Sequence, residues 1–517
     1  MFAARCRPGL GASCAAGETR PRPSVRRTFA VVALGGVLAS AAAAPSWGRG
    51  TIRWHGCGRG APAKLECGAI QVPLDYAHPN GGKIHLGFAR LRASDRRHRV
   101  GSLIVNPGGP GGAGSDVVAV EAAGMHLWHP ALHRRFDLIG MDPRGIGLSS
   151  PVRCDPAVYN RIVSFAPRSR AEFRRLDTHI RALGKSCLRR TGPLLRHVDT
   201  VSVARDMELL RRALGDGKLN FLGLSYGAEI GTLYAQRFPT RIRTMALDGI
   251  LDHGLPLTTI FSDNARGYED ALTRFAAWCA DEPSCALHGR DVLALYDELV
   301  RRANGQPIPA PECANQPCRR TVSGSDIQLA AYDQLLFKQP VPAFGVPGWN
   351  GLAQALAQAE AGDASVFAAH LATGPRDGPF SGLAVICSDF PSPVLGYRDF
   401  AAMGLLGRVL GPHSGGLAEA WTAVVGCMHW PVPAANPPRR VNIHRAPPIL
   451  LVSATHDPST PYVWAQDVRS QIRGSVLLTR DGDGHTSSLL AGSSTREAIA
   501  SYLITKKPPP PNSVLPD

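Results

Sequence analysis

Short hydrophobic segments separated by helical stretches dominate the chain from about residue 83 onward. Residues 83–91 alternate apolar and polar side chains, a pattern typical of an outer antiparallel strand with one buried face. Mostly apolar runs, typical of strands buried on both faces, follow at residues 102–105, 136–141, 218–222 and 243–247. Helical spacing separates them, as at residues 201–214. The pattern predicts an α/β protein with a mostly parallel sheet.

The strand rhythm stops after residue 252. Residues 253–440 are rich in Ala, Leu and aromatic residues at helical spacing and are broken by proline-rich stretches. Hydrophobic strands then resume at residues 448–453 and 475–478. We therefore expect a core domain in two sequence pieces, residues 44–252 and 441–505, interrupted by a helical cap. The proline-rich residues 506–517 are expected to form an extended, exposed tail.

The composition is that of a globular protein, because 44% of the 517 residues are hydrophobic and 19% are charged. The formal net charge of +16 raises the question of nucleic-acid binding. Residues 1–41 carry six of the arginines with one glutamate, and the other basic residues are scattered without a Lys/Arg block that interleaves aromatic residues. We expect a basic, solvated surface and no nucleic-acid partner.

The N-terminus has the three parts of an export signal. Arg26 and Arg27 precede an apolar run at residues 29–38, which is followed by small residues as far as Ala44. The paired arginines resemble those of a twin-arginine signal. Because the apolar run is too short for a confident membrane span, residues 1–43 are interpreted as a cleaved signal peptide. The mature protein is expected to be exported, in the periplasm, cell envelope or medium, without stable membrane insertion.

Cysteine usage agrees with export, since ten of the twelve cysteines follow the leader. They occur as near neighbours: Cys57 and Cys67, Cys154 and Cys187, Cys279 and Cys285, Cys313 and Cys318, Cys387 and Cys427. Up to five disulfides are expected, although spacing does not determine which cysteines pair. No His or Cys pair lies at zinc-finger spacing beside them, so no metal site or cofactor is predicted.

One motif carries the chemistry. Gly223-Leu224-Ser225-Tyr226-Gly227 lies between the predicted strand 218–222 and a helix at residues 228–235, and Gly-x-Ser-x-Gly occurs nowhere else in the chain. This order of strand, tight turn and helix is typical of a nucleophile elbow, which lifts a serine hydroxyl above the edge of a sheet. Ser225 is therefore the predicted nucleophile.

A serine hydroxyl needs an imidazole base and an acid that orients the base. In hydrolases with such an elbow the acid and the histidine follow the serine in that order, each after a late strand. Asp457 and His485 occupy those two places. The alternatives are Asp248, which follows the strand after the elbow, His456, which adjoins Asp457, and Asp481 and Asp483 beside His485.

Two backbone N–H groups must stabilise the oxyanion that forms during acyl transfer. The residue after the nucleophile, Tyr226, is expected to supply one. The glycine-rich loop 106–112 follows the strand 102–105 and is expected to supply the other, from Gly109. A phosphate-binding role for this loop is disfavoured because the Walker lysine and serine are absent.

Several motifs together resemble the secreted tripeptidyl aminopeptidases of the α/β-hydrolase superfamily, relatives of the proline iminopeptidases. They are Asn-Pro-Gly-Gly-Pro-Gly at 106–111, Asp-Pro-Arg-Gly-Ile-Gly-Leu-Ser at 142–149, the elbow at 223–227, Leu-Asp-Gly at 247–249, Trp-Cys at 278–279, Ala-Val-Ile-Cys-Ser-Asp at 384–389 and Cys-Met-His-Trp-Pro at 427–431. The resemblance covers roughly residues 53–505. It implies an α/β-hydrolase fold with the cap inserted after the sixth strand, and a triad of Ser225, Asp457 and His485.

The expected activity is removal of short units from the free N-terminus of peptides through an acyl-enzyme. Such an enzyme must hold the substrate's α-ammonium, which calls for a carboxylate facing the cleft. Asp389 is the first candidate, with Glu269 and Glu229 as weaker ones. A carboxylesterase or amidase of the same fold is the alternative, because the fold and the triad do not determine the substrate. The intact set of catalytic residue types argues against a silent binding protein.

Overall fold

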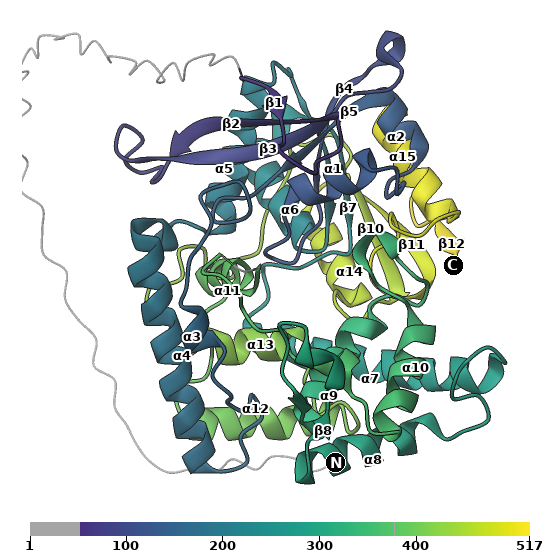
Figure 1. Cartoon of the computed structure of the whole chain (residues 1–517). Helices are drawn as coiled ribbons and strands as arrows, with labels where there is room; N and C mark the ends of the chain where they lie inside the picture. The colour runs from purple at the N-terminus through teal and green to yellow at the C-terminus, as the bar shows by residue number, and fades with distance from the viewer. Residues whose placement is uncertain (1–51, 377) are drawn as a thin grey trace, which may run out of the picture. The chain divides into compact units, whose positions relative to one another are not determined.

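The computed structural model describes residues 52–376 and 378–517, so the predicted signal peptide lies outside the described residues. Ten strands of the described chain form one sheet in the order β1-β2-β3-β5-β4-β6-β7-β10-β11-β12 (Figure 1). Their bounds are β1 (His55–Gly56), β2 (Leu65–Pro73), β3 (Lys83–Leu91), β4 (Gly101–Asn106), β5 (Phe136–Met141), β6 (Leu219–Leu224), β7 (Ile242–Asp248), β10 (Leu450–His456), β11 (Val476–Asp483) and β12 (Val514–Pro516). The pairs among β1, β2, β3 and β5 are antiparallel, and all other pairs are parallel.

Each parallel strand buries both of its faces. On β4, Ile104 packs into one hydrophobic cluster while Leu103 and Val105 pack into another on the opposite face. The first cluster includes side chains of α5 (Thr200–Ala213), α6 (Tyr226–Arg237) and α14 (Tyr462–Gln471), and the second includes side chains of α1 (Gly114–Ala122), α2 (Pro130–Arg135) and α15 (Ser494–Thr505). Helices therefore cover both faces, which explains the mostly apolar runs in the sequence.

The cap follows β7, which is the sixth strand of the sheet when the two-residue β1 is left aside. Figure 1 shows its helices grouped at one end of the sheet. They are α7 (Leu257–Asp281), α8 (Val292–Gly305), α9 (Gly324–Leu335), α10 (Trp349–Glu360), α11 (Gly378–Asp389), α12 (Tyr397–Leu410) and α13 (Glu419–Gly426), with a small ladder of β8 (Ile308–Pro309) and β9 (Thr321–Val322). The fold is that of an α/β hydrolase with a large helical cap.

One helix that packs with the cap comes from the first piece of the chain. After the short α3 (Pro156–Tyr159), α4 (Arg170–Thr191) buries Phe173, Leu176 and Ile180 in a cluster shared with α7, α12 and α13. The sequence pattern did not predict this contribution. The α4 chain carries few apolar residues, and those it has pack against segments far away in the sequence.

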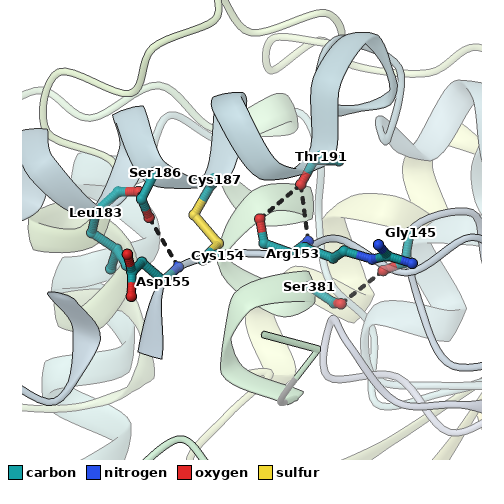
Figure 2. The surroundings of a disulfide bond; sticks show 9 residues. All are labelled: Gly145, Arg153, Cys154, Asp155, Leu183, Ser186, Cys187, Thr191 and Ser381. Carbon is teal, nitrogen blue, oxygen red and sulfur yellow. Dashed lines mark hydrogen bonds between the residues drawn. A yellow bond between two sulfur atoms is a disulfide. The ribbon is translucent and has the colours of Figure 1, made fainter. Parts of the chain in front are cut away.

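A disulfide between Cys154 and Cys187 ties α4 to the loop that follows β5 (Figure 2). Ser186 accepts a hydrogen bond from the Asp155 N–H at 3.1 Å, and Thr191 exchanges hydrogen bonds with the backbone of Arg153 at 2.9 and 3.0 Å. These contacts hold the C-terminal half of α4 against the core at three successive residues of the loop.

The structure joins the ten described cysteines into five disulfides, each between sequence neighbours. The tail differs from expectation. Its residues are extended and largely exposed, but Val514–Pro516 pairs with β11 as an edge strand, and Asp517 accepts a hydrogen bond from Arg480. No described helix is long and apolar enough to cross a membrane.

Candidate functional site

Ser225 lies on the turn between β6 and α6 with φ 56° and ψ −124°, a conformation that L residues rarely adopt. The flanking glycines explain how the turn is accommodated. A Cβ at Gly223 would lie 2.3 Å from the carbonyl oxygen of Gly227, and a Cβ at Gly227 would lie 2.8 Å from the carbonyl oxygen of Asn106. The sequence Gly-x-Ser-x-Gly is thus required by the close approach of strand, helix and loop, as an elbow demands.

His485 and Asp457 meet across the ends of β10 and β11. His485 Nδ1 lies 2.8 Å from Asp457 Oδ2, and both side chains are buried. Asp457 also accepts hydrogen bonds from the N–H groups of Ser459 and Thr460 at 2.9 Å each and from the Thr460 hydroxyl at 2.8 Å. Burial lowers the pKa of His485, but the Asp457 carboxylate outweighs it and raises that pKa above its ordinary value.

The imidazole of His485 is oriented with one nitrogen bound and the other free. Within the described residues His485 Nε2 has no hydrogen-bond partner, so it is available to accept a proton. Among the described residues no hydrogen bond joins it to Ser225, and such contacts often tighten only when substrate binds.

The alternative acids and bases have other partners. Asp248 accepts hydrogen bonds from the N–H groups of Ser487 and Ser488 at 2.7 to 3.0 Å and therefore anchors the loop after His485. His456 pairs with Asp270 at 2.9 Å, and Asp483 pairs with Lys338 at 2.9 Å. Asp457 is the acid that contacts the His485 ring.

The glycine-rich loop lies against the elbow. Gly108 and Gly109 have φ of 91° and 113°, and the Gly108 N–H donates to the side chain of Asn106 at 3.0 Å. A Cβ at Gly108 would lie 2.8 Å from the Cβ of Ser225. Because only glycine tolerates both the backbone conformation and this approach, the loop can bring its amide groups to the nucleophile.

A main cavity of about 1450 Å³ opens at these residues and is lined by Gly109, Ser225 and Tyr226 together with side chains of α4 and the cap. A smaller cavity of about 420 Å³, which we call the triad cavity, shares Gly109 and Ser225 with it and adds His485. Many of the main cavity's lining residues are apolar, including Phe390, Trp421 and Trp464. The cavity is larger than the range typical of small-ligand pockets, so it has room for a chain of several residues.

Two carboxylates of the cap line the triad cavity. Glu419, at the start of α13, is solvent-accessible there, and its Oε2 accepts a hydrogen bond from the Ser459 hydroxyl at 3.0 Å. Although Glu419 faces the cavity, the protein atoms around its carboxyl group desolvate it and raise its pKa. Asp333, on α9, lines the same cavity, and burial, with the Glu419 charge, raises its pKa to about 7. Two acids near each other in a partly dehydrated space favour a cationic ligand.

The predicted ammonium-binding acids do not line either cavity. Asp389 is fully buried behind the elbow, where it accepts hydrogen bonds from the Thr200 N–H and from Asn436 Nδ2. Glu229 is fully buried as well and pairs with His253 at 2.8 Å. Glu269 accepts hydrogen bonds from the N–H groups of His413 and Ser414 within the cap. Glu419 and Asp333, in contrast, line the triad cavity.

Sequence reasoning missed Glu419 and Asp333 because nothing local distinguishes them. Each lies on an otherwise ordinary helix, and the two are far apart in the sequence. Only the packing of α9 and α13 against the core brings them beside His485. No group of three or more His, Cys, Asp or Glu residues that could hold a metal ion occurs among residues 52–376 and 378–517.

Several known proteins are similar to this chain in sequence. The model of a family described as TAP-like protein matches residues 416–514. Serine protease Hip1 of Mycobacterium tuberculosis is 33% identical over 469 residues, which cover 87% of each chain. Carboxylesterase B of the same organism is 34% identical, covering 86% of this chain and 85% of its own. Tripeptidyl aminopeptidase of Streptomyces coelicolor is 29% identical, covering 92% and 86%. This chain therefore belongs to the tripeptidyl aminopeptidase family of α/β hydrolases and is an enzyme of the serine-hydrolase class.

Proposed function

We propose that this protein is an exported serine peptidase that removes short peptides from a free N-terminus, with Ser225, His485 and Asp457 as its catalytic triad. Three observations support the triad: the elbow geometry of Ser225, the 2.8 Å contact between His485 and Asp457, and the place of Ser225 and His485 in one cavity. The relatives named serine protease and tripeptidyl aminopeptidase support a peptide substrate.

The chemistry follows from these positions. His485 Nε2 takes the proton of the Ser225 hydroxyl as its oxygen attacks the scissile carbonyl, and Asp457 stabilises the imidazolium that forms. The N–H groups of Tyr226 and Gly109 stabilise the oxyanion. His485 then protonates the leaving amine, and a water molecule activated by the same histidine hydrolyses the acyl-enzyme.

The observation that carries the exopeptidase assignment is the pair of cap carboxylates in the triad cavity. A substrate with a free N-terminus brings an ammonium group, and Glu419 and Asp333 are the acids that line the cavity holding Ser225 and His485. Binding the ammonium there would orient the N-terminal unit so that its carbonyl faces the nucleophile. An acetylated N-terminus would leave this pair without a counter-charge.

Export is proposed from the leader and from the five disulfides, which are typical of proteins that fold in an oxidising compartment.

The test compares three substrates: a tripeptidyl chromogenic amide with a free amine, its N-acetylated twin, and a short acyl ester. We expect the free peptide to be cleaved and the acetylated peptide to be refused. Glu419→Gln and Asp333→Asn should raise KM for the free peptide and leave ester turnover unchanged. Glu172→Gln is the matched control, since Glu172 lines the main cavity on α4 but not the triad cavity. Equal cleavage of the free and acetylated peptides would contradict the assignment.

A carboxylesterase is the second candidate. The apolar lining of the main cavity and the relative named Carboxylesterase B favour it. Turnover of the ester alone, with Glu419→Gln without effect, would establish this alternative while leaving the triad in place.

A further inference from the structure

A third cavity, of about 500 Å³, lies outside the site described above. It is lined by Val201 and Arg205 of α5, by Leu233, Gln236 and Arg237 of α6, and by Phe238, His253, Asn436 and Arg439. None of these residues lines the main cavity or the triad cavity. Its volume is within the range of small-molecule pockets.

Three guanidinium groups face this cavity without an acidic partner. Within the described residues, none of Arg205, Arg237 and Arg439 forms an ion pair with an acidic side chain. Burial and the nearby charges of Arg205 and Arg439 lower the pKa of Arg237, which places the three cations close together. Arg205 also stacks over the Tyr76 ring, 5.1 Å from its centroid, so its side chain is held in position. Repulsion among unpaired cations is unfavourable unless an anion binds between them.

The floor of the cavity holds a histidine that is paired with a buried acid. His253 is 3% exposed and Asn436 is 5% exposed. Burial lowers the pKa of His253, but the Glu229 and Asp389 carboxylates outweigh it and raise that pKa to about 9. His253 is therefore protonated at neutral pH.

The neighbouring acids do not cancel this charge. Glu229 pairs with the protonated His253 at 2.8 Å, and Asp199, whose charge raises the pKa of Arg237, is a single carboxylate beside three guanidinium groups. The backbone carbonyl of His253 accepts a hydrogen bond from the Arg439 N–H at 3.0 Å, which holds the Arg439 segment at the rim. The positive charge of the three guanidinium groups therefore exceeds the negative charge of the nearby carboxylates.

We propose that this cavity binds a small anion through a phosphoryl group that is held by Arg205, Arg237 and Arg439. Guanidinium groups bind phosphate oxygens in pairs of parallel hydrogen bonds, and they remain charged at all physiological pH values. The volume exceeds that of one phosphate, so a diphosphate or a small organic phosphate fits the space better than inorganic phosphate.

The test is isothermal titration calorimetry of the full exported chain with inorganic pyrophosphate at constant ionic strength. We expect one site per chain, with affinity reduced about tenfold or more in an Arg237→Ala/Arg439→Ala variant because charge-assisted hydrogen bonds are lost. Arg398→Ala/Arg473→Ala is the matched control, since both arginines are exposed and line none of the three cavities. Its affinity should change less than twofold.

Binding should also persist after a fluorophosphonate has blocked Ser225, because the two sites share no residue. The inference is overturned if pyrophosphate does not bind, if the control loses as much affinity as the cavity variant, or if the blocked enzyme no longer binds it. Arg237 and Arg439 are exposed, so circular dichroism should show both variants folded. The single Arg439→Ala variant provides the same comparison should the double variant be unstable.

Discussion

The α/β core and the helical cap contribute to one cavity in different ways. The core presents Ser225, Asp457 and His485 on turns directly after buried strands, where the backbone is held on both sides by the sheet. The cap presents Glu419 and Asp333 from helices whose own sequences show no special pattern. The proposed reacting groups are thus placed by short-range geometry, whereas the acids proposed to select the substrate are placed by the packing of distant helices.

The largest effect that would test the core's role is expected from Ser225→Ala. Loss of the nucleophile should lower kcat by a factor of about 10⁶, the order seen when a serine nucleophile is removed elsewhere. The measurement is hydrolysis of the free tripeptidyl amide, with circular dichroism as the folding control. Retention of more than a few per cent of the activity would assign the chemistry to another residue.

The variants Asp457→Asn and Asp248→Asn distinguish the roles of the two buried acids near His485. Asp457→Asn should lower kcat by about 10⁴-fold, because the imidazole loses the acid that sets its tautomer. Asp248→Asn should lower thermal stability more than kcat, since Asp248 holds backbone N–H groups and not the ring. Steady-state kinetics and thermal unfolding of both variants check this contrast, and the reverse order of effects on kcat would exchange their roles.

A smaller effect, in KM, tests the cap. Asp333 has a raised pKa of about 7, so it is ionised above that pH and protonated below it. KM for the free-amine peptide should therefore fall as pH rises through about 7, until the substrate's own amine loses its proton near pH 8. Glu419→Gln should raise KM about 10- to 100-fold, as expected for a lost charge-assisted contact. A pH-independent KM for this substrate would argue against the carboxylate pair.

The pH dependence of kcat/KM tests the role of His485 in the core. Because the His485 pKa is raised, its imidazole stays protonated to a higher pH than an ordinary histidine, with a reference value near 6.5. The acid limb of kcat/KM should accordingly have its midpoint above about 6.5 for the ester as well as for the peptide. A midpoint below that value would contradict the assignment of His485 as the base.

The smallest effect concerns the link between the two regions. Removing the Cys154–Cys187 bond as a double serine variant should lower the free energy of unfolding by about 2–4 kcal/mol, since it closes a long loop. KM should rise only a few-fold, as α4 loosens against the cavity. The Cys279–Cys285 bond spans six positions and lies within the cap, so its loss should leave KM unchanged. Urea unfolding and peptide kinetics provide both readouts.

Most of the core could be predicted from the sequence. The strands at 83–91 and 136–141 have the predicted bounds, because alternation and mostly apolar runs report directly on one or two buried faces. The edge strand β12 was missed, since Val514–Pro516 is short and proline-rich and is defined by its pairing with β11. The role of α4 was missed for the related reason that its partners belong to the cap.

The sequence by itself determined the chemistry: an elbow serine, with Asp457 and His485 after late strands, is a local pattern because backbone sterics and strand burial act over a few residues. Only the tertiary structure decided which acids line the triad cavity. The sequence reasoning singled out Asp389 and not Glu419, but α11 turns Asp389 into the protein behind the elbow, while α13 turns Glu419 into the triad cavity. That choice depends on long-range packing of the cap, which no short stretch of sequence encodes.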